Sequence, residues 1–218
     1  MPSSKTQLAY SDLQEMLTSA KLTPGMVVSE ELLQTMTGMN RTPVREAVQL
    51  LTRERFFEIF PRKGIVVTDI TLELLNEIYD YREVNEPFIA VSACGKVPEN
   101  VLLEIRNKFC NPPSEYSEAK RKYLINLDTL LHSTLLDYCT NRFLYDGMKI
   151  VLAHDSRIKH FSYDEQTNDS VSIPQHLAII DSLLNHDLEN IHKSALLHIK
   201  SSRQLVTSSL LDRFIMSI

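Results

Sequence analysis

The sequence has few of the features that mark secreted or membrane proteins. It contains three cysteines, Cys94, Cys110 and Cys139, and no Cys-x-x-Cys pair. An odd set without that spacing argues for a reducing cytosol and against a disulfide scaffold or a thiolate metal site. No apolar run approaches the ~20 residues that a membrane-spanning helix needs, and Asp12 and Glu15 interrupt the N-terminal segment. We therefore expect a soluble cytoplasmic protein without a membrane span or secretion signal.

Glycine is also scarce, and the motifs of several enzyme classes are missing. None of the five glycines lies in a Gly-x-Gly-x-x-Gly, P-loop or Gly-x-Ser-x-Gly motif, and His-Glu-x-x-His does not occur. Ser-x-x-Lys occurs at Ser117–Lys120 and Ser156–Lys159, but its partner motifs are absent and so short a pattern recurs by chance. The sequence therefore offers no familiar enzyme signature.

The segment from Arg41 to Leu51 has the pattern of an amphipathic helix. Its apolar side chains recur at helical spacing on one face: Val44, Ala47, Val48 and Leu51. Polar side chains recur at i, i+4 and i+8 on another face: Arg41, Arg45 and Gln49. Asn40 is placed to act as N-cap, and Pro43 falls in the first turn, where its missing N–H costs nothing. One face should pack while the other presents guanidinium groups outward.

The flanking segments complete a winged helix. A shorter amphipathic stretch over residues 29–37 precedes the helix, and Gly38-Met39-Asn40 separates the two, which is a helix-turn-helix pattern. Downstream, Phe57–Phe60 alternates, Pro61–Gly64 breaks the pattern, and Ile65–Thr68 is rich in β-branched residues. These runs predict a two-stranded hairpin that forms the wing.

The net charge of −5 is unevenly distributed along the chain. The first 70 residues hold eight basic and eight acidic residues, so the whole excess of acid belongs to residues 71–218. Residues 41–64 carry six basic and three acidic residues, a local excess of +3. Such a local excess suits phosphate contact, although charges on an exposed helix are often only solvated.

The first part of the chain resembles the DNA-binding domain of GntR-type bacterial transcription regulators. Four blocks in the right order carry the resemblance: Leu22–Gly25, Ser29-Glu30, Arg41–Ala47 and Pro61–Gly64. Two positions depart from the family, since Asn40 stands where Ser is usual and Arg55 where Gly is usual. Asn caps a helix about as well as Ser, whereas Arg55 could alter the entry to the wing or add a phosphate contact.

The resemblance implies double-stranded DNA as a partner. The helix that begins near Thr42 would enter the major groove, with Arg41, Thr42 and Arg45 reaching base edges or phosphates. The wing would approach the minor groove through three further residues: Arg62, Lys63 and Gly64. One such module makes too few contacts for tight specific binding, so we expect a homodimer on an inverted-repeat operator.

From Thr71 onward the sequence predicts only helices. Apolar periodicity places them at about 71–94, 98–110, 114–139, 141–161, 172–186 and 187–211, with a polar loop from Asp164 to Ser172. No strand pattern competes, which favours an all-α antiparallel bundle. The fold class is thus mainly α, with a winged helix-turn-helix domain at residues 1–69 and a helical effector-binding and dimerisation domain at residues 70–218.

Four polar residues fall on the inward faces of these helices. Asp128 and His132 lie at i, i+4 on the edge of a leucine stripe made of Leu124, Leu127, Leu131 and Leu135. His176 is in register with Ile173, Ile180 and Leu183, and His198 shares a face with Ile191, Ala195, Ser202 and Leu205. A single such histidine is more often a hydrogen-bonded core residue than a ligand. Convergence on a metal ion would satisfy all four, whereas His154, His160, His186 and His192 lack partners at ligand spacing and are expected at the surface or in caps.

The same four residues resemble the effector-binding FCD domain of FadR-type GntR regulators. In that domain an Asp-x-x-x-His pair meets two later histidines, and the 22-residue spacing of His176 and His198 matches the usual one. The resemblance implies a divalent ion such as Zn²⁺, Ni²⁺ or Mn²⁺, with positions left for a carboxylate effector. It also implies effector contacts for Arg82 and Asn141, although Arg82 could instead pair with Glu86 at i+4 on an exposed face.

The sequence therefore predicts a ligand-responsive DNA-binding regulator, a repressor of a metabolic operon, rather than an enzyme. The alternative is a metal-dependent enzyme with an accessory DNA- or protein-binding domain, because three imidazoles and a carboxylate also describe hydrolytic sites. Catalysis would require a general base beside the bound water, and the sequence places none. In a third interpretation the metal only holds the bundle together.

Overall fold

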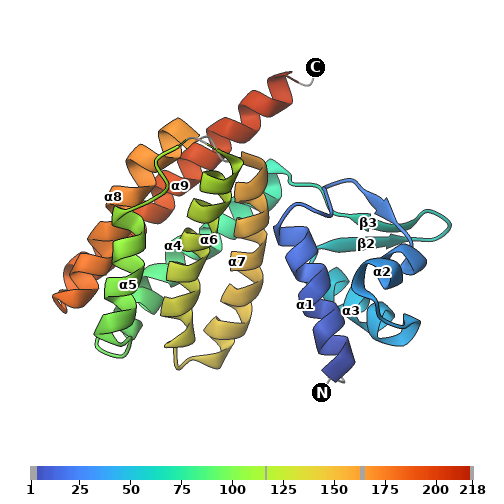
Figure 1. The fold of residues 1–218 in the computed structure, drawn as a ribbon, viewed down its shortest axis with the longest axis horizontal. Coiled ribbons are helices and arrows are strands. Elements are labelled where there is room, and N and C mark those ends of the chain that lie inside the picture. Colours follow the sequence, from blue (N-terminus) through green and yellow to red (C-terminus); the bar gives the residue numbers. More distant parts are fainter. Residues whose placement is uncertain (1–3, 116, 163–164, 217–218) are drawn as a thin grey trace. The chain divides into compact units, whose positions relative to one another are not determined.

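The computed structural model describes residues 4–115, 117–162 and 165–216, and the fold is mainly helical (Figure 1). The chain divides into two compact units, Met1–Thr71 and Leu72–Ile218. The first contains helices and a small antiparallel sheet, and the described part of the second contains helices only. The predicted fold class is confirmed.

Three helices form the core of the N-terminal unit: α1 (Ser4–Thr18), α2 (Glu30–Thr37) and α3 (Arg41–Arg53). Helix α3 packs on α1 and α2 through its four predicted apolar residues, and all four are buried: Val44, Ala47, Val48 and Leu51. Helix α1 contributes three buried apolar side chains: Ala9, Leu13 and Leu17. Since the apolar face of α3 is packed, its arginine-bearing face stays exposed.

The turn between α2 and α3 is set by local chemistry. The Ser29 hydroxyl accepts a hydrogen bond from the Leu32 N–H at 3.1 Å and so caps the start of α2. Gly38 ends α2 with a left-handed φ of 66°, which glycine adopts without strain. Asn40 occupies the N-cap position of α3, but its side chain makes no capping hydrogen bond, so the predicted cap is correct in position only.

The sheet has three strands, in the order β1-β3-β2, rather than the predicted two. Strands β2 (Phe57–Phe60) and β3 (Gly64–Val67) form the expected hairpin, and β1 (Val27–Val28) pairs antiparallel with β3 on its other side. A strand of two residues is too short to show an alternating pattern in the sequence. Arg55, which stands where GntR-type regulators usually have Gly, has a φ of 66°, the left-handed conformation that favours glycine.

The described residues of the C-terminal unit form six helices: α4 (Leu72–Ala93), α5 (Glu99–Cys110), α6 (Glu118–Asp137), α7 (Arg142–Ser162), α8 (Glu165–Leu184) and α9 (Leu188–Met216). Helix α9 packs along α4 and α8, and α6 packs on α7 (Figure 1). The predicted leucine stripe of α6 is buried throughout, so Asp128 and His132 face inward. None of the described helices is long and apolar enough to cross a membrane.

The predicted loop from Asp164 to Ser172 is wrong for the described residues, because α8 begins at Glu165. The first turns of α8 are polar in sequence and show no apolar periodicity, which is why the pattern did not predict them. Their position depends instead on tertiary contacts, such as the ion pair of 3.0 Å between Asp169 and Lys120 of α6.

Candidate metal centre and DNA-binding surface

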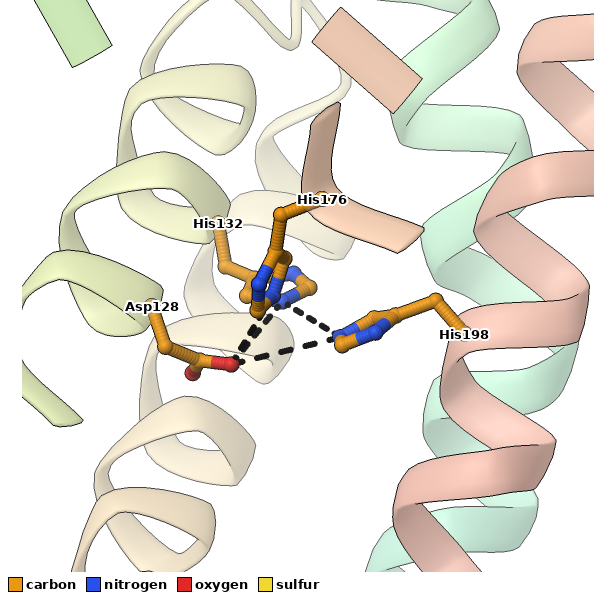
Figure 2. A group of neighbouring side chains, drawn as sticks. All are labelled: Asp128, His132, His176 and His198. Carbon is orange, nitrogen blue, oxygen red and sulfur yellow. Dashed lines mark hydrogen bonds and ion pairs between the residues drawn. The ribbon is translucent and has the colours of Figure 1, made fainter. Parts of the chain in front are cut away.

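The four predicted ligands come together inside the helical unit (Figure 2). Asp128 and His132 come from α6, His176 from α8 and His198 from α9. Each is buried, and the four candidate ligand atoms all lie within 4.8 Å of one another. The convergence that helical spacing suggested is therefore present in three dimensions.

One oxygen and three ring nitrogens surround a common point. The His176 Nε2 lies 3.1 Å from Asp128 Oδ1, and the Nε2 atoms of His132 and His198 are 3.3 Å apart. His132 Nε2 and His198 Nε2 lie 3.8 and 4.0 Å from the same Asp128 oxygen. The rings of His132 and His198 are stacked, with centroids 5.2 Å apart. This is a mixed N/O donor set of the kind that binds divalent transition metals.

Unsatisfied polar atoms show that the cluster fits a metal ion. Both ring nitrogens of His176 and the Nδ1 of His198 are buried without a hydrogen-bond partner. A buried polar atom left unpaired costs about 1–3 kcal/mol. An ion held by the four residues would engage His176 Nε2, which lies 3.1 Å from Asp128 Oδ1 but outside good hydrogen-bond geometry. The cluster could therefore hold a metal ion, and its chemistry does not select one metal.

Glu86 of α4 orients His132 from behind. Its Oε2 lies 2.5 Å from His132 Nδ1. Because a carboxylate can only accept, the imidazole proton sits on Nδ1 and the lone pair of Nε2 is directed into the cluster. Glu86 in turn pairs with Arg82, which also pairs with Asp155 of α7. The predicted Arg82–Glu86 pair is therefore present, but it is buried rather than exposed.

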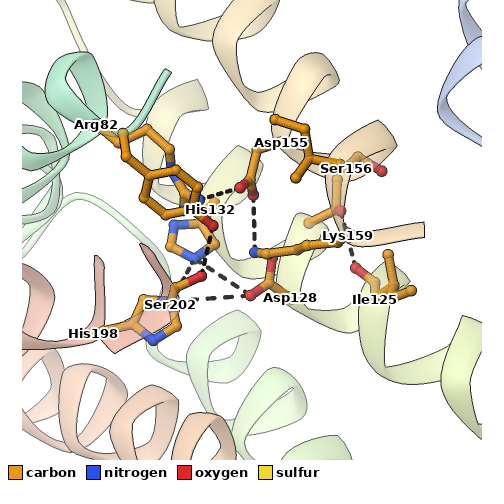
Figure 3. Close-up of polar contacts among 12 residues, drawn as sticks. Arg82, Ile125, Asp128, His132, Asp155, Ser156, Lys159, His198 and Ser202 are labelled. Atoms are coloured by element: carbon orange, nitrogen blue, oxygen red, sulfur yellow. Dashed lines mark hydrogen bonds and ion pairs between the residues drawn. The ribbon is translucent and has the colours of Figure 1, made fainter. Parts of the chain in front are cut away.

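Lys159 of α7 is a second neighbour that the sequence analysis missed (Figure 3). Its Nζ lies 2.5 Å from Asp128 Oδ2 and 2.9 Å from Asp155 Oδ2. Asp128 thus directs one oxygen to the histidines and the other to an ammonium group. The sequence does contain Asp155 and Lys159 as a charged i, i+4 pair. Periodicity alone did not show that this pair is buried.

The electrostatics favour the protonation states that metal binding needs. Burial alone would raise the pKa of Asp128, but the positive charge of the Lys159 ammonium outweighs burial and holds the pKa well below its usual 3.8. Burial also favours the uncharged form of Glu86, but the Arg82 guanidinium outweighs burial and lowers the pKa of Glu86 to about 2. Burial lowers the pKa of His198 well below 6.5 and also lowers that of His176. The carboxylates are therefore charged and these two imidazoles neutral at pH 7.

A small cavity adjoins the cluster. Asp128, His176 and Lys159 line one part of it, and three hydroxyl groups line another: Ser162, Ser172 and Ser202. Apolar side chains close the rest, among them Phe109, Leu124 and Val206. Its volume of about 30 Å³ holds a few water molecules at most. An organic effector larger than a small acid such as acetate would require the helices around it to move apart.

The two residues expected to contact an effector lie elsewhere. Arg82 is fully buried between Glu86 and Asp155 and is not among the described residues that line the cavity. Asn141 is exposed, and its Oδ1 accepts hydrogen bonds from the N–H groups of Phe143 and Leu144, which caps α7. The structure does not bring Asn141 to the cluster, and the effector roles of both residues stay predictions.

The other histidines follow the expectation only in part. His186 and His192 are exposed, as predicted. His154 and His160 are buried, so their prediction as surface or capping residues is wrong. They lie on α7, which is covered by neighbouring helices, and His160 Nδ1 lies 3.0 Å from the Ser156 carbonyl oxygen. Short-range spacing did not show that this part of α7 is covered on several sides.

The predicted DNA-contacting residues lie on the surface of the N-terminal unit. The side chains of Arg41 and Arg45 are 70% and 62% exposed on α3, where they border a shallow depression with Thr42. The Nε atoms of both arginines lie near the Glu30 carboxylate, at 3.0 and 3.9 Å. The wing residues lie in or beside the turn between β2 and β3: Arg62, Lys63 and Gly64. Arg62 and Gly64 both have positive φ there.

Comparison with known proteins identifies the family. Residues 5–67 match the gntR family of bacterial regulatory proteins, and residues 77–201 match the FCD domain. The chain belongs to the GntR family of transcription regulators that carry an FCD domain. This membership makes the protein a DNA-binding regulator and sets aside the enzyme interpretation.

Relatives and solved structures match along most of the chain. It is 25% identical over 197 residues to the uncharacterised HTH-type regulator YdhC of Bacillus subtilis, which covers 87% of this chain and 85% of that protein. It is 20% identical over 200 residues to the HTH-type transcriptional repressor RspR of Escherichia coli, and the match covers 92% of this chain and 88% of that protein. The structure of E. coli McbR/YncC, at 18% identity, has a TM-score of 0.80 and covers 95% of this chain and 99% of that one, so the fold is shared.

The lowered histidine pKa values predict how the stability of the metal-free regulator depends on pH. As pH falls below 6.5, the ordinary histidine value, the unfolded chain binds protons at His176 and His198 that the folded chain does not bind. The free energy of unfolding should then fall by about 1.4 kcal/mol per pH unit for each histidine until its folded pKa is reached. The lowered pKa values of Glu86 and Asp128 reduce the free energy of unfolding further, but only below about pH 4.5.

Urea unfolding in the presence of a chelator, at several pH values between 7.5 and 5, measures this slope. His198→Gln should make it shallower, whereas the exposed His192→Gln should leave it unchanged. A stability that stays flat from pH 6.5 to 5 would contradict the pKa assignment.

Proposed function

We propose that this regulator is a repressor that binds an inverted-repeat operator as a homodimer and leaves it when a small carboxylate binds beside a metal ion in the FCD bundle. The observation that carries the proposal is the buried cluster of Asp128, His132, His176 and His198 next to a cavity. The E. coli relative RspR, which is named as a repressor, supports repression rather than activation. Regulators of this kind would govern operons that metabolise the carboxylate itself.

The DNA contacts would come from α3 and the wing. Helix α3 buries its apolar face and presents Arg41 and Arg45 outward, which is the arrangement of a recognition helix in the major groove. The guanidinium groups can reach guanine O6 and N7 or the phosphates. Glu30 holds both arginines near one another while no DNA is bound, and phosphate or base acceptors would replace it.

Arg45→Ala should weaken binding to the specific operator by about 1–3 kcal/mol if Arg45 makes a bidentate base contact. An operator selected from random duplexes would be titrated in gel shifts, with circular dichroism to confirm folding. Arg53→Ala is the matched control, since Arg53 is exposed in the last turn of the same helix and its loss removes the same charge. Equal affinity of the folded Arg45 variant and the wild type would remove Arg45 from the interface.

Dimerisation is expected because one winged helix makes too few contacts for tight specific binding. The described helical unit exposes apolar side chains on two helices that pack together. Val84 and Phe88 of α4 are 74% and 56% exposed, and Phe143 at the start of α7 is 92% exposed. Val84 and Phe88 are one turn apart and point the same way. We place the dimer contact on this part of α4 and α7, because large exposed apolar groups favour burial by a partner.

Val84→Asp combined with Phe88→Asp should shift the full chain from dimer to monomer at micromolar concentration, since a buried unpaired carboxylate is costly. Sedimentation velocity measures the change. Leu103→Asp on α5 is the control, because Leu103 is also an exposed apolar residue, at 47%, and lies on another helix. A wild-type chain that sediments as a monomer would instead require a different account of how two half-sites are bound.

The buried charges suggest why a carboxylate suits the metal centre. Two cations, Arg82 and Lys159, face three carboxylates, Glu86, Asp128 and Asp155. The sum is one net negative charge when the three imidazoles are neutral, as metal ligands must be. A divalent ion would change this balance to one net positive charge, and a bound carboxylate would neutralise it. Held by the four residues, the ion would offer its remaining coordination positions to water or to an acid.

Elemental analysis of purified protein should find about one divalent ion per chain, and a chelator should lower the melting temperature because the ion binds only the folded state. His132→Ala or His198→Ala should abolish stoichiometric metal, since each removes one of four ligands. His192→Ala, on the exposed side of α9, should not. The ligand variants should still bind the operator while they stay folded.

The same variants test what the metal does. If the ion binds the effector, the His132→Ala and His198→Ala proteins should still bind operator DNA, but a carboxylate should no longer release them from it. Release that survives in metal-free variants would contradict an effector role. It would leave the interpretation in which the metal only stabilises the bundle, provided that the wild-type protein contains the ion.

A further inference from the structure

Lys159 is a buried lysine whose charge is shared by two acids. Its Nζ lies 2.5 Å from Asp128 Oδ2 and 2.9 Å from Asp155 Oδ2, and the side chain is 9% exposed (Figure 3). The same side chain lines the cavity beside the cluster. The Lys159 ammonium is therefore close to the candidate metal centre and accessible from the cavity where a ligand would lie.

The lysine limits how Asp128 can act. With Oδ2 held by Lys159, only Oδ1 of Asp128 faces the three imidazoles. Asp128 would then give a metal ion one oxygen instead of two. Fewer protein ligands leave more coordination positions for a small molecule.

We infer that Lys159 is the residue that selects an anionic ligand for this cavity, by donating to one carboxylate oxygen while the metal centre takes the other. This inference rests on the proposed function. Among the described residues that line the cavity, Lys159 is the one with a positive charge. The other charged lining residues are Asp128 and Asp169, and Asp169 pairs with Lys120. A neutral or cationic ligand would leave the positive charge of a metal-loaded site unbalanced.

The role predicts effects of opposite sign on metal and acid. The ammonium repels a cation held at the neighbouring Asp128, so its removal should strengthen metal binding. It attracts an anion in the cavity, so its removal should weaken acid binding by about tenfold or more, the scale of one charge-assisted hydrogen bond. Simple structural damage would weaken both.

Co²⁺ and acetate are suitable probes for the full-length protein. Competition with a chromophoric chelator gives the Co²⁺ affinity, and the visible spectrum of the Co²⁺-loaded protein reports acetate entering the coordination sphere. For Lys159→Met we expect tighter Co²⁺ binding and acetate affinity lowered about tenfold or more. Lys159→Arg keeps the charge and should keep most of the acetate affinity. Lys149→Met, on the exposed side of α7, should match the wild type in both measurements.

The outcomes separate the two levels of the proposal. If wild-type protein binds no Co²⁺, the metal centre is refuted, and the Lys159 role with it. If wild-type protein binds Co²⁺ and acetate and Lys159→Met binds acetate equally well, only the Lys159 role is overturned. Lys159→Gln, which is neutral but polar, provides the same comparison where thermal unfolding shows that the Met variant is not folded.

Discussion

The interior of the helical unit depends on the polar contacts of one buried carboxylate, that of Asp128. It lies between three imidazoles on one side and the Lys159 ammonium on the other. Through Lys159 it is linked to Asp155, Arg82, Glu86 and back to His132. Loss of one member of a buried ion pair costs about 3–5 kcal/mol, because it leaves the other charge uncompensated. The same carboxylate is thus needed for a stable core and for a metal site.

The two units meet different physical demands. In the N-terminal unit the candidate DNA-contacting side chains are exposed, and short local features hold their segments in place: the Ser29 cap, the left-handed Gly38 and the hairpin turn. In the helical unit the candidate metal ligands are buried and come from different helices. Their protonation is set by burial and neighbouring charges, so this unit should respond to pH and metal, whereas DNA affinity should respond mainly to salt.

Much of the fold could be predicted from sequence because it follows local rules. The apolar spacing of α3 predicted the face that is buried, and Gly38 predicted the turn before it. The leucine stripe of α6 placed Asp128 and His132 on one side of a helix, and their meeting with His176 and His198 followed from inward faces on three helices. The sequence by itself determined the fold class, the family blocks and the four candidate ligands, since each depends on spacing within one segment or on residue order.

Only the tertiary structure decided the features that depend on distant partners. Strand β1 exists because two residues pair with β3, and their own pattern is too short to predict a strand. The polar start of α8 is helical although its sequence shows no apolar periodicity. Glu86 and Lys159 reach the cluster from α4 and α7, and Asn141 caps a helix away from it. Periodicity says which side of a helix faces inward, but the packing of helices decides which inward charges meet.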